Sequence, residues 1–232
     1  MLLAVLQLAA RRLPWTPVAA FWLVASLAAW LGLLGMVATR EGIAEDDRPL
    51  LSWLVAHRDG AWTGVMAGIS STGVIAAAVV IALVLVAGIA ARSRSWRPLA
   101  TVVLALGGSA TAGVILKSLV RRSRPPVATM LGAPETGWGF PSNHTLVTAA
   151  LAGGLVLVVW RATRHPLARA AVAVVAATAS LAMGASRLYL GDHWLTDVLA
   201  SFALAVGVVA VVAWMTGPAG ELLLRRTLRR RA

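Results

Sequence analysis

The chain has 232 residues, of which 59% are hydrophobic and only 13% are charged, and its mean hydropathy is +0.81. Soluble domains contain about 25% charged residues, so this composition excludes an ordinary soluble protein and predicts a polytopic membrane protein. Cysteine is absent, which excludes disulfides and cysteine-based metal or redox sites. The formal charge of +12 comes from small basic groups between apolar runs, an arrangement that indicates membrane topology and argues against nucleic-acid binding.

Residues 1–10 are apolar, but Arg11 and Arg12 follow them. A secretory signal has the reverse charge order, so we expect no cleaved peptide here but a short interfacial helix or a disordered lead. Beyond this lead, six apolar segments are long enough to cross a bilayer core of about 30 Å. They cover approximately residues 18–38, 73–91, 98–116, 144–160, 170–185 and 193–214.

The connection between the first two spans, residues 39–60, is polar and acidic. Within it, residues 49–55 predict a short helix with three leucines on one side and Trp53 nearby, which is typical of a helix in the membrane interface. The apolar run 61–91 is too long for one span, and residues 70–73 are expected to divide it into a partly inserted helix and the second span. The sequence therefore predicts an all-α polytopic membrane protein with six transmembrane helices. We expect one integral membrane domain over 1–232, with a core at about 47–214 and a basic cytoplasmic tail at 215–232.

The distribution of charge predicts which ends of the spans face the cytoplasm. If the amino terminus is inside, the termini and the turns at 92–97 and 161–169 hold thirteen of the twenty-one Lys and Arg residues. Eight of the nine acidic residues then lie outside, and only Glu221 lies inside. Cytoplasmic connections carry the excess of Lys and Arg, so both termini are predicted to be cytoplasmic. Three polar segments, residues 117–124, 139–144 and 186–197, then share the extracytoplasmic face.

The segment 186–197 holds Arg187, Asp192, His193 and Asp197 between two uncharged apolar runs. Ionisable groups are costly at membrane depth, so such a cluster is a candidate functional site. His193 and Asp197 are four residues apart, which places them on one face of a helix if the last span begins near His193. A carboxylate that orients an imidazole suits a histidine that acts as a nucleophile or as a base.

The other two polar segments supply cations and a helix amino terminus. The first holds Lys117 and Arg124, and the second leads through Ser142, a predicted helix cap, to His144 at the start of the fourth span. The free N–H groups of a helix amino terminus favour an anion, and Arg and Lys stabilise charge on phosphoryl oxygens. Together the segments suggest a phosphate site in which His193 is the nucleophile and His144 donates a proton to the leaving oxygen.

In these segments the chain resembles the type 2 phosphatidic acid phosphatase superfamily, which shares its site with acid phosphatases and vanadium haloperoxidases. The first family motif, Lys, six residues, Arg-Pro, matches at Lys117, Arg124 and Pro125. The second, Pro-Ser-Gly-His, matches at positions 141, 142 and 144, with Asn143 in place of the usual Gly. The third, Ser-Arg, five residues, His, three residues, Asp, matches fully within residues 186–197. The order of the motifs and the six-helix frame match as well.

The resemblance implies a metal-independent phosphatase that needs no cofactor. It implies that His193 forms a phosphohistidine, that Asp197 orients its ring, and that His144 protonates the leaving oxygen and then activates water. The phosphate-binding residues that it implies are Lys117, Arg124, Ser142, Arg187 and, through its backbone N–H, Asn143. Asn is the side chain that best tolerates the left-handed backbone that a Gly permits, so we expect activity to survive this replacement.

These expectations describe an integral lipid phosphatase of a bacterial cytoplasmic membrane, acting at the outer face on a phosphomonoester or diphosphate of a membrane lipid. Phosphatidic acid, phosphatidylglycerol phosphate and a polyprenyl diphosphate such as undecaprenyl diphosphate are all candidates, and the oligomeric state is left open. The alternatives are a lipid phosphotransferase with the same site, a metal-dependent hydrolase, and a non-catalytic membrane protein that binds or transports anionic lipids. Trp138 and Phe140 flank the loop before His144 and are equally compatible with lining a lipid path and with anchoring in the membrane.

Several polar residues lie outside the matched motifs or have no assigned role. His57 and His165 are interpreted as interfacial bystanders, and Asp192 as a residue that caps or turns the start of the last helix. Arg121 and Arg122 are either cations that attract the phosphate or headgroup, or plainly solvated charges.

Overall fold

The computed structural model describes residues 15–217. The predicted lead at residues 1–10 and most of the basic tail lie outside this described part. Within it the helices are, in chain order, α2 (Trp15–Thr39), η1 (Gly42–Asp46), α3 (Asp47–Ala56), α4 (Gly60–Ser70), α5 (Thr72–Ser93), α6 (Arg97–Val120), η2 (Val127–Thr129), α7 (Asn143–Ala162), α8 (Pro166–Tyr189) and α9 (Leu195–Met215).

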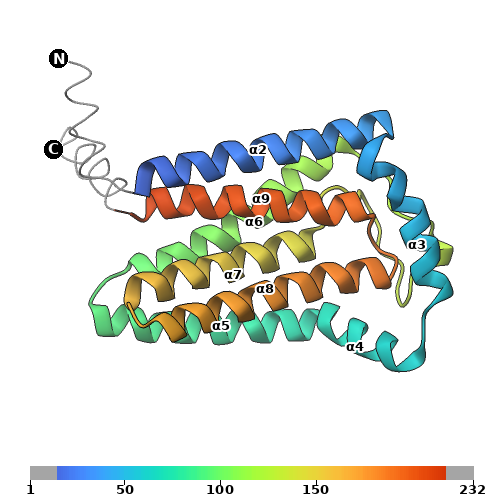
Figure 1. The fold of residues 1–232 in the computed structure, drawn as a ribbon. Helices are drawn as coiled ribbons and strands as arrows, with labels where there is room; N and C mark the ends of the chain where they lie inside the picture. The colour runs from blue at the N-terminus through green and yellow to red at the C-terminus, as the bar shows by residue number, and fades with distance from the viewer. Residues whose placement is uncertain (1–14, 218–232) are drawn as a thin grey trace, which may run out of the picture.

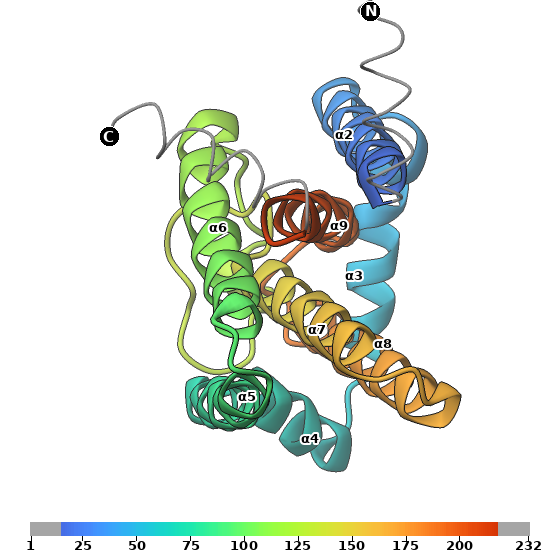
Figure 2. The ribbon, with the colours of Figure 1, turned by 90° about the vertical axis from the view of Figure 1, so that its left-hand side faces the viewer.

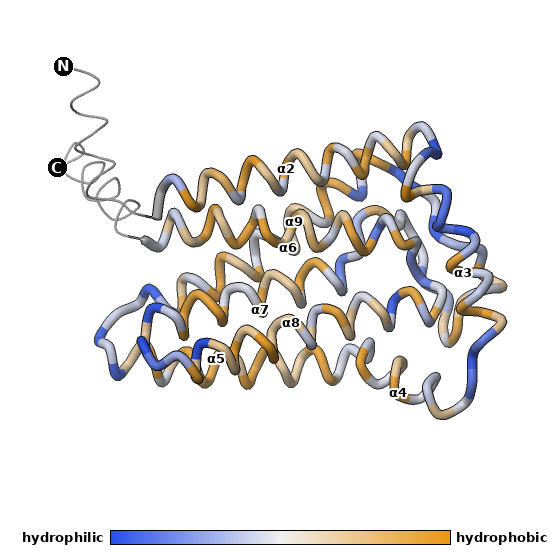
Figure 3. The backbone as a smooth tube through the Cα atoms, viewed as in Figure 1, coloured by the Kyte–Doolittle hydropathy of each residue, from blue (hydrophilic) through white to orange (hydrophobic). Residues whose placement is uncertain are grey.

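Within residues 15–217, six helices are long and apolar enough to span a membrane: α2, α5, α6, α7, α8 and α9. They lie side by side in one bundle (Figure 1), with apolar middles and polar ends (Figure 3). The predicted number and order of spans are confirmed. Large apolar side chains such as Val84 and Leu181 face outward, because hydrocarbon rather than water surrounds the middle of such a bundle.

Helix α9 forms the centre of the bundle. It packs against α2, α6 and α7, while α8 packs on α7, and α5 packs on α6 and α7 (Figure 2). The helices approach closely at small residues: a Cβ added to Gly154 would lie 3.3 Å from that of Ala105, and one added to Gly207 only 2.5 Å from Oγ of Ser26. Small residues at crossings are how membrane helices pack without a hydrophobic driving force between them. The position of α9 is therefore fixed by three neighbours.

The connection after α2 forms two short helices. Helix α3 crosses the end of the bundle (Figure 1) and buries Leu51, while α4 packs against α8 and ends at Ser70. Ser71 then caps α5, since its Oγ accepts from the N–H of Val74 at 3.3 Å. The short helix at 49–55 and the break at 70–73 are both confirmed. How deeply α3 and α4 lie in a membrane stays a prediction.

Two of the helix boundaries that differ from the predicted ones lie at the polar segment 186–197. Helix α8 extends to Tyr189 instead of ending near 185, so Arg187 lies in its last turn. Helix α9 begins at Leu195, so His193 precedes this helix and does not start it. The end of α8 stays helical although it is polar, because Ser186, Arg187 and Tyr189 are buried against neighbouring elements and do not face lipid.

Candidate active site

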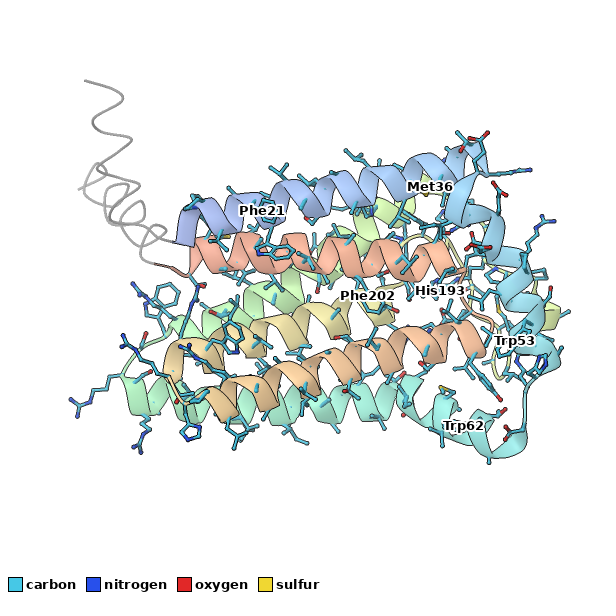
Figure 4. The ribbon with its side chains drawn as sticks, in the orientation of Figure 1. Phe21, Met36, Trp53, Trp62, His193 and Phe202 are labelled. Carbon is cyan, nitrogen blue, oxygen red and sulfur yellow. The ribbon has the colours of Figure 1, made fainter. Side chains whose placement is uncertain are left out.

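The three polar segments meet at one end of the bundle, where α6 and α8 end and α7 and α9 begin. Figure 4 shows His193 at this end, just before α9. Arg124 follows α6 and contacts His193, while Glu135, in the loop before α7, joins Arg124 to Arg187 at the end of α8. The structure thus brings together side chains that are up to about seventy residues apart in the chain, as their common predicted face implied.

His193 is 2% exposed, and both of its ring nitrogens have partners. Nδ1 lies 3.3 Å from Oδ2 of Asp197, and Nε2 lies 3.0 Å from Nη1 of Arg124. A guanidinium only donates hydrogen bonds and an ionised carboxylate only accepts them. Nδ1 therefore carries the proton, and Nε2 presents its lone pair to the cations. This is the tautomer that a histidine nucleophile requires.

The surroundings of His193 also fix its charge. Burial lowers its pKa to about 4, against the hydrogen bond and the charge of Asp197, which favour the protonated ring. Because the usual pKa of histidine is about 6.5, burial keeps this ring neutral through the physiological range. A neutral ring retains the lone pair that attack on phosphorus needs.

Arg124 and Arg187 form a cationic cradle beside His193. Nη1 of Arg124 lies 2.8 Å from Oε2 of Glu135, and Nη2 of Arg187 contacts the other carboxylate oxygen. Arg187 is 3% exposed, and its Nε has no hydrogen-bond partner among the described residues. Two converging guanidinium groups, one with a spare donor, suit an anion with several oxygens such as a phosphoryl group.

Glu135 is part of this site, although no motif predicted it. Besides the two arginine contacts, its Oε1 lies 3.8 Å from Nδ1 of His144. Burial disfavours the charged carboxylate, but Arg187 and Arg124 outweigh this effect and hold the pKa of Glu135 below its usual value. Its carboxylate marks the position at which the cradle holds negative charge. The loop around Glu135 has no regular spacing from which its place was predictable.

Asp192 lies in the turn before α9, as one of the two predicted roles has it, but its side chain does not cap this helix. Its Oδ2 lies 2.9 Å from Nη2 of Arg187, and both side chains are 4% exposed. The cap of α9 comes instead from Asp197, whose Oδ2 accepts from the N–H of Trp194 at 3.1 Å. Burial raises the pKa of Asp192, although Arg187 acts in the opposite direction. Asp192 and Glu135 thus both contact Nη2 of Arg187 and hold its guanidinium in place.

Ser142 and His144 lie at the start of α7. Ser142 occupies the N-cap position, but its side chain makes no capping hydrogen bond; its Oγ accepts from Oγ1 of Thr145 at 3.1 Å instead. The predicted side-chain cap is therefore wrong, because the hydroxyl is engaged by its neighbour. The amino end of α7 consequently lacks a side-chain cap, and free N–H groups at such an end favour an anion. The side chain of His144 is 30% exposed and faces Glu135.

Asn143, which replaces the family Gly, fits because of a glycine on the facing helix. It is the first residue of α7 and its φ is not positive, so tolerance of a left-handed backbone is not the reason that it is accepted. Its buried Oδ1 lies against Gly113 of α6, where an added Cβ would collide with it. This Oδ1 has no hydrogen-bond partner among the described residues.

The loop before α7 is pinned to the bundle from two sides. Phe140 is fully buried, and its ring centroid lies 5.9 Å from that of Trp30. Phe140 therefore neither lines a lipid path nor anchors in the membrane; it fixes the site loop in the core. From the other side, Nζ of Lys117 donates to the carbonyl of Trp138 at 2.5 Å. The remaining ammonium protons of Lys117 are available to an anion.

Two other histidines take no part in this cluster. His57 stacks on Trp53, with ring centroids 4.5 Å apart, and His165 is an exposed residue at the start of α8. Among residues 15–217, no group of three or more His, Asp or Glu side chains is arranged to hold a metal ion. Nε2 of His193 faces Arg124, whose positive charge repels a metal cation.

The profile of the PAP2 superfamily matches residues 98–221, more than half of the chain and all three motif segments. The chain belongs to the PAP2 superfamily. This membership confirms the resemblance to type 2 phosphatidic acid phosphatases that the motifs indicated.

Two bacterial relatives carry the same name. Phosphatidylglycerophosphatase B of Bacillus subtilis is 29% identical over 146 residues, which cover 61% of this chain and 69% of that protein. Phosphatidylglycerophosphatase B of Escherichia coli is 36% identical over 81 residues, which cover 35% of this chain and 30% of that protein. The crystal structure of a transmembrane PAP2-type phosphatidylglycerolphosphate phosphatase from Bacillus subtilis superposes with a TM-score of 0.70 at 24% identity, over 83% of this chain and 94% of that chain. This last similarity supports the all-helical membrane fold.

Proposed function

We propose that this PAP2-superfamily protein is a membrane lipid phosphatase that removes a terminal phosphate through a phosphohistidine on His193. The observation that carries the proposal is the orientation of this ring. Nδ1 faces the buried carboxylate of Asp197, and Nε2 faces the cradle of Arg124 and Arg187. A histidine with only a structural role needs no cations at its free nitrogen. The phosphatidylglycerophosphatase relatives support a lipid phosphate as the substrate class.

In the first step the phosphoryl group displaces Glu135 from the cradle. Nε2 of His193 attacks phosphorus, and the new N–P bond forms as the P–O bond to the lipid breaks. His144 delivers its proton to the leaving oxygen, so the lipid departs as an alcohol, or as a monophosphate if the substrate is a diphosphate. The phosphorylated ring is cationic, and Asp197 stabilises it. Arg124 and Arg187 stabilise the charge on the transferring phosphoryl oxygens.

In the second step water attacks the phosphorus of the phosphohistidine. His144, which lost its proton in the first step, accepts a proton from this water. The N–P bond breaks, its electron pair returns to Nε2 of His193, and inorganic phosphate leaves. The net reaction consumes one water and one lipid phosphate and yields phosphate and the dephosphorylated lipid. The scheme uses no metal ion, because Lys117 and the two arginines supply the positive charge.

We further propose phosphatidylglycerol phosphate as the first substrate to test, because both named relatives act on it according to their names. Phosphatidic acid and undecaprenyl diphosphate present the same terminal phosphoryl group and belong in the same panel. The basic residues that the sequence carries in its termini and in the turns at 92–97 and 161–169 support a bacterial cytoplasmic membrane, with the termini inside and the site on the outer face.

The test is phosphate release from these three lipids by the full chain in detergent micelles. Wild type is expected to release phosphate from at least one lipid without an added acceptor and in the presence of EDTA. His193→Ala should lower kcat/KM by at least about 10³-fold, because no other group in the site replaces the nucleophile. His57→Ala is the matched control and should stay within about twofold of wild type, since His57 stacks on Trp53 outside the cluster.

Three outcomes contradict the proposal. Absence of phosphate release from every lipid by well-folded wild type removes the hydrolase assignment. Equal release by wild type and His193→Ala removes His193 from the mechanism. Strong inhibition by EDTA contradicts the metal-independent scheme.

A further inference from the structure

We propose that Arg122 and Asp47 are positioning residues that act on catalysis through Asp197. The proposal rests on the proposed function, because it concerns the orientation and charge of the group that holds His193. Arg122 lies between Lys117 and Arg124 in the chain, at a position that the family motif leaves unspecified. Its side chain points to the far side of Asp197 and not into the phosphate cradle.

The contacts of Arg122 join two carboxylates. Nη1 lies 2.5 Å from Oδ1 of Asp197 and 2.6 Å from Oγ1 of Thr196, while Nη2 lies 2.5 Å from Oδ2 of Asp47. The side chain is 15% exposed, whereas those of Asp47 and Asp197 are 5% and 0% exposed. Ion pairs between side chains this far from solvent are more fixed in geometry than solvated surface pairs.

Asp47 anchors this arrangement to the start of α9. Its Oδ1 accepts from the N–H of Thr196 at 2.9 Å, and its Oδ2 accepts from the Thr196 hydroxyl at 2.7 Å. Asp47 is the first residue of α3, so the helix that crosses the end of the bundle is tied to the residue next to Asp197. Arg122 bridges the same two elements from the end of α6. Three separate parts of the chain therefore converge behind the catalytic carboxylate.

These contacts divide the two oxygens of Asp197 between two tasks. Oδ2 faces Nδ1 of His193 and the N–H of Trp194, while Oδ1 faces Arg122. A carboxylate held at both oxygens cannot rotate, so the imidazole that it orients keeps one direction. A fully buried carboxylate is also costly unless a counter-charge accompanies it. Arg122 supplies that charge and keeps Asp197 ionised when the phosphorylated ring becomes cationic.

Asp197 lies between Arg122 and His193, so Arg122 does not reach the phosphate cradle of Arg124 and Arg187. Arg122 also lines a cavity of about 490 Å³ together with Arg40, Arg48 and Trp194, and neither His193 nor His144 lines this cavity. Substitution of a residue that binds the phosphate directly would change KM and the affinity for inorganic phosphate. A positioning residue is expected to affect kcat and to lose its effect when Asp197 is changed.

The experiment compares Arg122→Met and Arg122→Lys with wild type in lipid phosphate release by the full chain. Arg122→Met should lower kcat by about 10- to 100-fold, with KM and the inhibition constant of inorganic phosphate within about threefold. Arg122→Lys keeps the charge but not the rigid fork of donors, so its kcat should lie between that of wild type and that of Arg122→Met. Asp47→Asn weakens the ion pair of Arg122 with residue 47 but keeps its ion pair with Asp197. It should therefore lower kcat by a smaller factor than Arg122→Met.

Matched controls lie next to both residues. Arg121→Met and Asp46→Asn change exposed neighbours that make no contact with Asp197, and each should stay within about twofold of wild type. The phosphate inhibition constant, measured on the residual activity, also separates a misfolded variant from a folded one, because it reports on the cradle independently of the size of kcat.

The decisive comparison repeats Arg122→Met in an Asp197→Asn background. If Arg122 acts through Asp197, the substitution should change kcat there by less than about threefold. The same 10- to 100-fold loss in both backgrounds would overturn the proposal, as would a wild-type kcat for Arg122→Met or a loss confined to KM. Inactive wild type with every lipid would overturn the proposed function and this inference together, whereas active wild type with an unaffected Arg122→Met overturns this inference alone.

Discussion

At the scale of single residues, the chemistry depends on how the chain surrounds His193. The motif spacing predicted the pairing of His193 with Asp197 and the nearby cations Arg124 and Arg187. It did not predict that the ring is neutral, because this state depends on burial by segments distant in sequence. The pKa of about 4 is therefore a property of the folded site.

The depressed pKa of His193 has a measurable consequence for the pH profile. The unprotonated ring is the reactive form, so attack on phosphorus should persist as pH falls and be lost only near pH 4. The pH profile of kcat/KM is first corrected for the ionisation of the substrate phosphate, which is measured separately. We expect the acidic limb of the corrected profile to have its midpoint well below pH 6. A midpoint near 6.5, the value of an unperturbed histidine, would contradict the burial argument.

The contacts of two charged residues in the site could not be predicted from the sequence, for a physical reason. Glu135 lies in an irregular loop, and Arg122 lies between two motif residues beside the exposed Arg121. Their partners come from other elements: Arg187 for Glu135, and Asp47 for Arg122. An adjacent pair such as Arg121 and Arg122 looks equivalent in sequence until the fold turns one of them toward a buried carboxylate.

At the scale of the elements, the apolar length of each span predicted its existence well, and its ends less well. Helix α8 runs past 185 because Arg187 and Tyr189 are buried by α4 and the preceding connection, and such partners are not visible in hydropathy. The same reasoning explains Phe140. An aromatic residue before a predicted span resembles a membrane anchor, but tertiary packing against Trp30 of α2 buries it in the bundle.

The contact between α6 and α7 gives a prediction at this scale. Gly113→Ala should push a Cβ into Oδ1 of Asn143 and displace the start of α7, including His144. We expect kcat/KM to fall by about 10-fold, because small displacements of catalytic groups are costly. Adding Asn143→Gly removes the colliding side chain and should restore kcat/KM to within about threefold of wild type.

Gly107→Ala on the same helix is the control for this pair. Nothing lies within 4 Å of a Cβ added at Gly107, so its activity should equal that of wild type. Failure of Asn143→Gly to rescue Gly113→Ala would show that the two residues do not act through their contact.

At the scale of the whole molecule, the arrangement of the bundle explains why the polar side chains of the candidate active site gather at one of its ends. Within residues 15–217, six spans that alternate in direction place the start of α2 and the end of α9 at one end of the bundle (Figure 1), whereas His193 lies at the other end (Figure 4). An even number of spans returns the chain to its starting side, so the polar connections of the other side are free to gather around α9. Composition and span count predicted this architecture, and the PAP2 superfamily membership agrees with it. Which side faces the cytoplasm stays a prediction from the charge distribution.

The most direct test of the account is to identify the phosphorylated residue during turnover. The full chain in lipid nanodiscs is mixed with a substrate labelled in its terminal phosphate, quenched in alkali and mapped by mass spectrometry. We predict a burst of label on His193 that is stable in alkali and labile in acid, and that is absent from His193→Ala. Label on another residue, or rapid phosphate release without any labelled enzyme, would contradict a phosphohistidine on His193.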